Sequence, residues 1–473
     1  MAPTVGRREF LRQFLQRAAV SGAASQWLLR AQDDAGWSQA SAILDRIQPP
    51  SFPDRDFNVT AYGAVNDGRT DCTEAIREAI AECNSVGGGR VVVPKGVFLT
   101  GPVHLRSNVH LHLDDQATLL FSRDPMQYLP VVYSRWEGVE LMNYSACVYA
   151  DNAQNVAITG GGTLDGNSDC EGAWWQWNPG ADCVRPPGPS LQTADRNRLF
   201  EMGARDVPLE ERVFGEGSHL RPCLVQFCNS RNILIEGLTL KNSPMYVVNP
   251  VLCSNVTVRG IHVDSHGPNN DGCDPDSSRD VLIDRCTFDT GDDCIAIKSG
   301  RNRDGRRVGV PSENTVIRDC SMKDGHGGVT IGSEMSGGVR NVFVEDCEMD
   351  SPNLQQALRF KTNAVRGGII ENIYFRDIVV GQVSNAVLQV DCQYEEGANG
   401  PEQPIVRNIH LANINCRKSR FALQLRGLAA SPIQDIHLED CTFDGVAEPN
   451  VLENVETVQA IRVKINGEPF PGI

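Results

Sequence analysis

A seven-residue pattern recurs along this chain and constrains its fold more than any other feature. The pattern reads Asn or Asp, apolar, any, apolar, any, polar or Gly, and then Cys or an aliphatic residue, as in Asn341–Cys347. From Asn232 onward, successive copies start 23, 25, 34, 27, 31, 36 and 27 residues apart. The copies start at Asn155, Asn232, Asn255, Asp280, Asn314, Asn341, Asn372, Asn408 and Asp435.

The pattern predicts short strands stacked in a solenoid. Apolar residues that alternate over so short a run indicate strands, and a recurrence of about 20–40 residues indicates a repeat architecture. No long helical periodicity separates the copies, so leucine-rich and ankyrin-type repeats fit poorly. We therefore predict an all-β chain folded as a right-handed parallel β-helix. A β-helix grows coil by coil, so residues 57–473 are expected to form a single domain.

Two segments precede this domain. Residues 1–32 contain Arg7-Arg8-Glu9-Phe10-Leu11-Arg12, which resembles a twin-arginine export signal and predicts a periplasmic or extracellular protein. The alternative is a basic terminus without a targeting role. Residues 33–56 are interpreted as a linker. No run approaches 18 apolar residues, so no membrane-spanning helix is expected.

A helix is predicted at Thr73–Asn84, just inside the start of the domain. Thr70 and Asp71 can cap it, and one face carries an apolar stripe. Such a helix would cover the first coil, whose strand edges would otherwise be unpaired. The stripe consists of Ala75, Ile76, Ala79, Ile80 and Cys83.

A long insertion interrupts the repeat. Asn155 and Asn232 are 77 residues apart, so about 50 residues, roughly 166–221, are additional. We expect an ordered loop there, and Cys170 with Cys183 is the best candidate for a disulfide. The insertion also contains Trp174, Trp175 and Trp177.

The other cysteines are predicted to be reduced and buried. Cys286, Cys320, Cys347 and Cys441 occupy the last position of the pattern, where other copies have Leu or Ile. A position that accepts either Cys or Ile treats Cys as a small hydrophobic residue. No Cys-x-x-Cys pair is present, so no metal site is predicted.

Acids and bases recur in phase with the pattern. Asp271 lies 16 residues after the start of its copy, Asp292 and His326 each lie 12 after theirs, and Arg359 lies 18 after its own. Adjacent strands are ~4.8 Å apart, so these residues should line one face across about four coils, a length that suits a short sugar chain. The alternative is that they merely occupy turns. Adjacent acids such as Asp292 and Asp293 repel each other, which favours a functional site.

Charge narrows the possible ligands. The formal net charge of −16 argues against nucleic acid, and no nucleotide or haem motif is present, so no cofactor is predicted. A second basic group follows the paired aspartates and either extends a groove for an anionic chain or is simply solvated. It comprises Lys298, Arg301, Arg303, Arg306 and Arg307.

Four motifs in order resemble glycoside hydrolase family 28, the polygalacturonases and their relatives. They are Asn-x-Asp at Asn269–Asp271, Gly-Asp-Asp at Gly291–Asp293, Gly-His-Gly at Gly325–Gly327 and Arg-x-Lys at Arg359–Lys361. The resemblance covers roughly residues 57–463 and is to bacterial exo-acting members. It implies a pectin-lyase-like β-helix and inverting hydrolysis of α-1,4-galacturonosidic bonds in pectic polysaccharides or oligosaccharides.

The resemblance also implies residue roles. Asp292 would be the general acid, and Asp271 with Asp293 would hold the attacking water. His326 would tune the protonation of the acid. The residues expected to bind substrate are Asn269, Arg359, Lys361 and Tyr394. Arg359 and Lys361 alternate along one strand, so both should face the uronic carboxylate.

Two other functions are considered. A pectate-lyase-like β-elimination would need a calcium cluster and an Arg base, and a non-catalytic polysaccharide-binding β-helix would not need three acids.

Within the hydrolase interpretation, the insertion precedes the coil of Asp271, and its tryptophans and arginines could close the groove around a chain end. We therefore expect exo action, and the alternative is an insertion packed on the far side or used in oligomer contacts.

Overall fold

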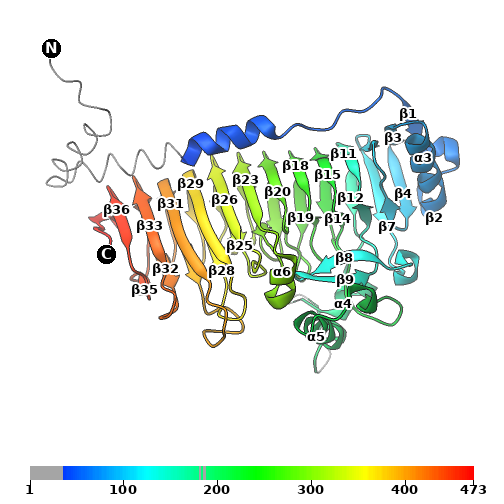
Figure 1. Ribbon diagram of the computed structural model, residues 1–473. Coiled ribbons are helices and arrows are strands. Elements are labelled where there is room, and N and C mark those ends of the chain that lie inside the picture. Colours follow the sequence, from blue (N-terminus) through cyan, green and yellow to red (C-terminus); the bar gives the residue numbers. More distant parts are fainter. Residues whose placement is uncertain (1–35, 181–182, 185–187) are drawn as a thin grey trace, which may run out of the picture.

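The computed structural model of the protein describes residues 36–180, 183–184 and 188–473 (Figure 1). Its strands stack side by side into a long parallel β-helix, as the repeat predicts. Among the named strands of the described residues, only β8–β9 and β37–β38 pair in antiparallel fashion. No helix within these described residues is both long enough and apolar enough to cross a membrane.

Each coil contributes strands to three faces. The first face contains β11 (Gln154–Gly160), β15 (Arg231–Glu236), β18 (Ser254–Arg259), β20 (Arg279–Asp284), β23 (Ser312–Arg318), β26 (Val339–Glu345), β29 (Ile369–Gln382), β31 (Ile405–Cys416), β33 (Gln434–Glu439) and β36 (Val458–Ile461). The second contains β12 (Thr163–Asp165), β16 (Thr239–Lys241), β19 (His262–Ser265), β21 (Thr287–Thr290), β24 (Ser321–Met322), β27 (Glu348–Asp350), β34 (Thr442–Phe443) and β37 (Lys464–Ile465). The third contains β10 (Val148–Asp151), β14 (Val225–Cys228), β17 (Val248–Val251), β22 (Ile295–Ile297), β25 (Gly325–Ile331), β28 (Leu354–Lys361), β30 (Ala386–Asp391), β32 (Phe421–Arg426) and β35 (Val451–Glu453).

The sequence pattern sets the register of the first face. Its second positions stack from coil to coil, so that Val281 pairs with Thr315 and Thr315 with Val342. The same register continues through Ile373, Ile409 and Ile436. Residues at the same position of the pattern in successive copies are therefore paired on adjacent strands of the structure.

The first and sixth positions of the pattern are polar because the backbone turns there. Asn341 and Asp346 have φ values of 56° and 53°, in the left-handed region that Asn, Asp and Gly tolerate best. The asparagines also form a ladder along the solenoid. Asn341 Nδ2 donates to Asn314 Oδ1, and Asn372 Nδ2 donates to Asn341 Oδ1, both over 3.1 Å.

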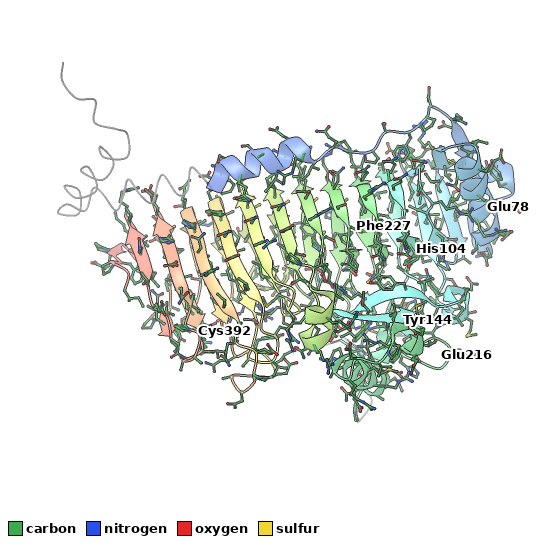
Figure 2. All side chains as sticks on the ribbon, in the orientation of Figure 1. Glu78, His104, Tyr144, Glu216, Phe227 and Cys392 are labelled. Carbon is green, nitrogen blue, oxygen red and sulfur yellow. A yellow bond between two sulfur atoms is a disulfide. The ribbon has the colours of Figure 1, made fainter. Side chains whose placement is uncertain are left out.

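The last position of the pattern faces the core. Cys286, Cys320, Cys347 and Cys441 are all buried and free, as predicted. Phe227 and Cys392 likewise lie inside the coils, whereas the exposed Glu78 projects from the helix Thr73–Ser85 (Figure 2). The core is a continuous column of aliphatic, aromatic and thiol side chains.

The predicted capping helix is present as α3 (Thr73–Ser85). Its apolar stripe is buried against the first coils. Oδ1 of Asp71 accepts a hydrogen bond from the backbone N of Thr73 over 2.9 Å, so Asp71 supports the first turn. The first coils comprise β1 (Asp56–Asn58), η1 (Val59–Tyr62), β2 (Asp67–Asp71), β3 (Gly89–Val93), β4 (Gly96–Thr100), β5 (Val103–His104), β6 (Val109–Leu113) and β7 (Ala117–Phe121).

The expectation of a linker at 33–56 is wrong for its described part. Residues 36–46 form an α-helix that lies across the outside of the first face (Figure 1). Ile43 is fully buried there, and the Trp37 ring lies 5.6 Å from that of Phe343. This helix packs on the first face because the third residue of several copies of the pattern is apolar and points outward from that face. The export signal predicted at 1–32 lies outside the described residues.

The insertion is ordered and partly helical. It contains α4 (Ala173–Trp177), α5 (Leu191–Ala204), η3 (Leu209–Glu211) and β13 (Val213–Phe214), and the Cys170–Cys183 disulfide is present as predicted. β13 pairs with a hairpin of β8 (Val132–Trp136) and β9 (Val139–Asn143) that follows η2 (Pro125–Tyr128). Two further elements are α6 (Asn302–Val308) and β38 (Glu468–Pro469).

Candidate active site

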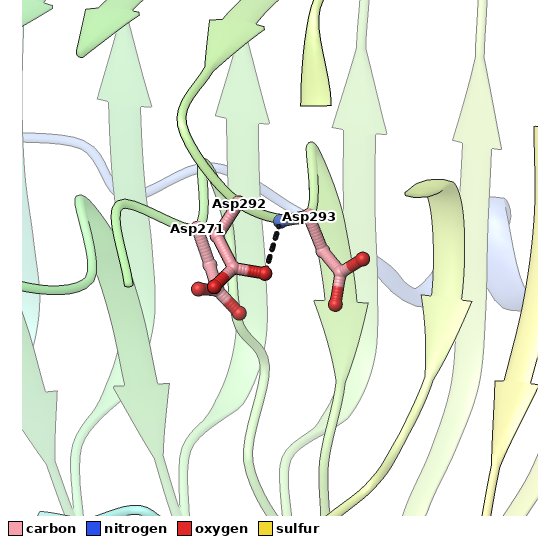
Figure 3. Close-up of side chains that lie close together, drawn as sticks. All are labelled: Asp271, Asp292 and Asp293. Atoms are coloured by element: carbon pink, nitrogen blue, oxygen red, sulfur yellow. Dashed lines mark hydrogen bonds between the residues drawn. The ribbon is translucent and has the colours of Figure 1, made fainter. Parts of the chain in front are cut away.

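Three aspartates meet where two neighbouring coils turn towards the third face. Asp271 follows β19, and Asp292 and Asp293 lie between β21 and β22. One oxygen from each carboxylate lies within 4.8 Å of the other two, and the three side chains lie side by side (Figure 3). The backbone N of Asp293 donates to Oδ1 of Asp292 over 3.0 Å, which fixes that carboxylate. The phase of these residues in the sequence thus predicted a real cluster.

His326 lies one coil beyond Asp292, because β25 pairs with β22. Its Nδ1 is 2.8 Å from Oδ1 of Asp292, and its backbone N donates to the Asp292 carbonyl over 3.0 Å. The hydrogen bond to Asp292 and the charge of that carboxylate raise the pKa of His326, although burial opposes the rise. The imidazole is therefore biased towards its charged form beside Asp292.

Asp293 is bracketed by two bases. Lys361 Nζ lies 2.7 Å from Oδ2 of Asp293, and Arg359 Nη1 lies 3.2 Å from Oδ1. Burial alone would raise the pKa of Asp293, but Lys361 and Arg359 outweigh it and hold the pKa well below its usual range. Asp293 is thus the carboxylate that stays ionised. Arg359 and Lys361 share one face, as predicted, but their nearest anionic partner is an aspartate of the protein.

Asp271 is in the opposite situation. Its side chain is buried, and burial raises its pKa to about 7, with further contributions from Asp292 and Asp293. Lys298 opposes the shift, since its Nζ lies 3.2 Å from Oδ2 of Asp271. Asp271 therefore retains a proton at near-neutral pH, as expected for one of several crowded carboxylates that cannot all ionise together.

Glycine is needed beside this cluster. A Cβ at Gly327 would lie 2.9 Å from Oδ1 of Asp293 and 2.2 Å from Oγ1 of Thr330. Any larger residue would displace Asp293 from its bases. This contact gives a physical reason for the second glycine of the Gly-His-Gly motif.

The turn that carries Asp271 is held by buried polar groups. Asn270 is completely buried, and its amide bonds Ser265 Oγ, the N of Gly267 and the carbonyl of Met245. Asn269 Oδ1 accepts from Nη2 of the buried Arg221 over 2.6 Å. These contacts orient Asn269 and Asp271 through the backbone. Arg221 belongs to the insertion, and no repeat relates it to the site in the sequence.

Tyr394 lies at the site, in the loop after β30. Its ring centroid is 5.4 Å from Lys361 Nζ and 5.7 Å from Arg359 Cζ. Tyr394 belongs to the coil that follows the coil of Arg359 and Lys361, and its ring lies against both bases. All eight residues predicted for the site are therefore gathered in one region, and their roles remain predictions.

A cavity of about 230 Å³ opens at this cluster. Sequence reasoning missed part of its wall, because those residues lie in segments that the repeat does not place. The lining residues are Glu137, Asn178, Ser190, Gln192, Thr193, Arg196, Tyr246, Asn269, Asp271, Asp292, Lys298, His326, Ser333, Glu334, Lys361, Tyr394 and Glu395. Six of the eight predicted site residues line the cavity. The other two lie directly behind lining residues: Asp293 is paired with Lys361, and Arg359 lies next to the ring of Tyr394.

The second basic group does not form a free cationic groove. Lys298 is 3% exposed and bound to acids, and Arg301 is 5% exposed and paired with Glu334, Glu395 and Glu396. The other three arginines are paired as well. Arg303 contacts Asp206, Arg306 contacts Glu402, and Arg307 contacts Glu140 and Asp304. The group holds loops together, which corrects the extended-groove interpretation.

The tryptophans of the insertion do not offer faces to a sugar in this cavity. Trp174 is completely buried and packs edge-on against Tyr128 and Trp177. Trp175 donates its Nε1 hydrogen to the Ser243 carbonyl over 2.9 Å. They pack the insertion onto the coils because large flat side chains supply most of its apolar contact. Polar residues that follow them in the chain, among them Asn178 and Gln192, line the cavity instead.

Glycoside cleavage needs one carboxylic acid to protonate the leaving oxygen and one carboxylate to activate water. The aspartate cluster offers both, because it combines one carboxyl whose pKa is raised to about 7 with another carboxylate that stays ionised. On the flank of a parallel β-helix, this chemistry defines a glycoside hydrolase of the β-helix type. The three carboxylates are also close enough to hold a metal ion, but Lys298, Lys361 and Arg359 already neutralise two of them.

Comparison with known proteins agrees with this class. A sequence profile described as "Glycosyl hydrolases family 28" matches residues 214–461, a little over half of the chain, and one described as "Rhamnogalacturonase A/epimerase, pectate lyase-like" matches residues 57–114. A probable polygalacturonase of Vitis vinifera is 30% identical over 422 residues, which are 85% of this chain and 76% of that protein. The chain belongs to glycosyl hydrolase family 28.

Two further relatives are named as exo-acting enzymes. An exo-poly-alpha-D-galacturonosidase of Dickeya chrysanthemi is 28% identical over 359 residues, 72% of this chain and 57% of that protein. The crystal structure of a hyperthermoactive exopolygalacturonase from Thermotoga maritima matches with a TM-score of 0.89 and 45% identity, and the match covers 93% of this chain and 98% of that one.

Proposed function

We propose that this chain is a polygalacturonase that hydrolyses α-1,4-galacturonosidic bonds from the non-reducing end of pectic chains, with inversion. The observation that carries the proposal is a cluster of three aspartates in which the pKa of Asp271 is raised and that of Asp293 is lowered. The cluster lies at a cavity that residues of the insertion help to line. The names of the exo-acting relatives support the same conclusion.

Asp292 is the general acid. Its Oδ1 is occupied by His326 and by the backbone N of Asp293, while the carboxylate lines the cavity. Asp271 carries the proton of the cluster in the free site, and this proton passes to Asp292 when the leaving oxygen is next to it. A charged His326 beside Asp292 favours release of that proton to the substrate, because it stabilises the carboxylate that remains.

Asp271 and Asp293 hold the attacking water. Oxygens up to 4.8 Å apart can both accept hydrogen bonds from one water molecule. Both oxygens of Asp293 are engaged by cations, and Lys298 engages one oxygen of Asp271. Neither carboxylate is free to bond directly to the sugar carbon, although both lie closer to the acid Asp292 than the ~6.5–9.5 Å usual between the acid and the base of inverting enzymes. Water attack on the opposite face of the sugar then inverts the anomeric carbon.

The sugar on the leaving side meets a basic wall. Lys361 lines the cavity beside Tyr394, and its charge is shared with Asp293. We assign the uronate of this sugar to Lys361 and Arg359, with Tyr394 packed against the ring. Asn269, which lies at the other side of Asp271, contacts the sugar on the non-reducing side.

Exo action follows from the walls of the cavity. α5 of the insertion supplies Gln192, Thr193 and Arg196, and the β8–β9 hairpin supplies Glu137. Buried ion pairs fasten the hairpin to the coils, including Arg135–Asp276 at 2.7 Å. A wall fixed in this way blocks a chain from continuing past the cavity.

A digest of polygalacturonate tests this proposal. Viscosity and reducing ends are followed together, and early products are separated by chromatography. We expect reducing ends to rise while viscosity changes little. A sharp drop in viscosity at a few per cent hydrolysis, with mixed oligomers appearing early, would show internal cleavage. A calcium-dependent rise in absorbance from an unsaturated product would instead show β-elimination.

We also propose that the protein is exported. The twin arginines Arg7-Arg8 ahead of Phe10-Leu11 support this proposal. Fusion of residues 1–35 to a reporter tests it: the reporter should leave the cytoplasm, and an Arg7→Lys, Arg8→Lys double variant should retain it there. Equal export of both fusions would contradict a twin-arginine signal.

A further inference from the structure

One wall of the cavity comes from two segments outside the repeat. Glu137 sits at the tip of the β8–β9 hairpin with a φ of 40°, and Gly138 follows with a φ of 77°. The Gly138 carbonyl accepts from the backbone N of Arg301 over 2.9 Å, and a Cβ at Gly138 would lie 2.7 Å from that nitrogen. The hairpin tip is therefore docked closely on the coil. α5 lies beside it and contributes Arg196.

The cations around this cavity differ in what they already bind. Lys298 lies 3.2 Å from Asp271, 3.4 Å from Glu334 and 3.6 Å from Asp274, and only 3% of its side chain is exposed. Lys361 is 2.7 Å from Asp293 and 8% exposed. Both ammonium groups are thus largely committed to carboxylates of the protein.

Arg196 is different. Its Nε donates to Glu137 Oε2 over 3.1 Å, and 36% of its side chain is exposed. Within the described part of the chain, no acceptor contacts its Nη1 or Nη2. Glu137 holds the guanidinium by one edge, and two donors at the other edge remain available in a cavity that must receive an anionic sugar. Two parallel donors suit a carboxylate, which Arg binds in bidentate fashion.

The cavity is also small. Its volume of about 230 Å³ is below the ~300–1,000 Å³ typical of pockets for drug-sized ligands. A volume of this size suits few sugar rings, and Asp271, Asp292, Glu137 and Arg196 all line it. A terminal sugar held at the aspartates therefore lies in the same small cavity as Arg196.

We propose that Arg196 binds the carboxylate of the galacturonate at the non-reducing end, so that the enzyme releases one galacturonate per cleavage and requires that terminal carboxylate to be free. This inference rests on the proposed exo function and specifies its substrate. The terminal residue must be an unesterified uronate, whereas the insertion alone would only require a chain end.

The test compares two substrates on two enzymes. The substrates are trigalacturonate and the same trisaccharide with a methyl ester on the non-reducing-end carboxylate only. The enzymes are the wild type and Arg196→Gln. We expect the ester to lower the wild-type kcat/KM by about 10- to 100-fold, the size of a hydrogen-bonded charge contact. Arg196→Gln should lose the same factor on the free acid and very little on the ester.

Controls separate binding from folding. Arg196→Lys keeps the charge and should regain part of the discrimination. Arg205→Gln removes an arginine at the end of the same helix that is 71% exposed, and it should behave as wild type. If Arg196→Gln loses activity equally on both substrates, Arg196 only supports the fold and the inference is overturned.

The products distinguish this inference from the function on which it rests. Monogalacturonate as the first product from the wild type supports both. Digalacturonate released first from chain ends overturns the one-sugar cavity but leaves exo action standing. Early release of mixed internal fragments from polygalacturonate overturns the exo function itself, whatever the Arg196 variants do.

Discussion

The ammonium group of Lys361 lies 2.7 Å from Oδ2 of Asp293, and this ion pair determines which of the three clustered carboxylates is ionised. With Arg359 at Oδ1, Asp293 carries a fixed negative charge even though it is buried. That charge makes Asp271 harder to ionise. The bases on β28 thus influence the proton of the cluster, in addition to the substrate binding that we propose for them.

Asp292→Asn should abolish proton donation while leaving the solenoid folded. General acid catalysis is typically worth ~10²–10⁴-fold, so we expect kcat to fall at least that far, with the unfolding midpoint nearly unchanged. Asp264→Asn is a matched control, because Asp264 lies on β19 close to the site and is 60% exposed. Retention of more than about a tenth of wild-type activity by Asp292→Asn would show that another group is the acid.

Activity should fall as pH rises through about 7. Asp271 supplies the proton that Asp292 donates, and the pKa of Asp271 is raised to about 7. Above that pH Asp271 loses its proton, and no acid remains for the leaving oxygen. Lys298 lowers the pKa of Asp271, so Lys298→Met should raise it and move the alkaline limb of kcat/KM to higher pH.

The Lys298→Met variant should also unfold more easily. Removing one partner of a buried ion pair typically costs about 3–5 kcal/mol, so the pH profile is measured well below the unfolding temperature. Lys464→Met is the control, since Lys464 is exposed on β37. An alkaline limb that stays in place in Lys298→Met would mean that Asp271 does not supply the catalytic proton.

The sequence was informative wherever the repeat relates residues to one another. The first position of the pattern marks a turn, the second sets the register and the seventh faces the core. The register in turn predicted that the aspartates and His326 lie close together. The third position reads as variable, yet Phe343 occupies it and faces outward under helix 36–46. No periodicity marks such a strip as covered.

The cavity wall could not be predicted for a related reason. Glu137 and Arg196 lie 59 residues apart in segments outside the repeat, so nothing in the sequence places them together. The insertion's tryptophans were its most conspicuous residues, but apolar side chains in a 50-residue loop are first needed to pack it onto the coils. Trp174 is buried for that purpose.

The stereochemistry of the product provides a separate check on the water site. If Asp271 and Asp293 hold the nucleophilic water, hydrolysis of an α-linked chain should first release the β anomer. Proton NMR of a rapid digest, recorded before mutarotation, measures this directly. Initial release of the α anomer would indicate a covalent intermediate and would assign a nucleophilic role to one of these aspartates.

Thiol titration should reveal a nearly inert native protein. All fourteen free cysteines of the described residues are buried, and burial raises the pKa of Cys441 to about 12, so few thiolates form. We expect slow reaction in the native state and about fourteen reactive thiols after denaturation without reductant. Oxidation of Cys286, Cys320 and Cys347 in the native protein would contradict their assignment to the core.

The asparagine ladder should contribute measurably to stability. Asn341 has a φ of 56° and shares one amide hydrogen bond with Asn314 and another with Asn372. Asn341→Ala removes both bonds and places a Cβ without polar compensation in the left-handed region. The bonds are worth about 0.5–1.5 kcal/mol each, and the backbone conformation costs roughly 1–2 kcal/mol. We expect the free energy of unfolding to fall by about 2–5 kcal/mol.

Asn341→Gly separates the two contributions, because glycine adopts a positive φ without strain. It should lose the hydrogen bonds alone and lie between the wild type and Asn341→Ala in a denaturant titration. Equal destabilisation by Gly and Ala would mean that the ladder, and not the backbone conformation, selects asparagine at the first position. A glycine variant as stable as the wild type would assign the whole preference to the turn.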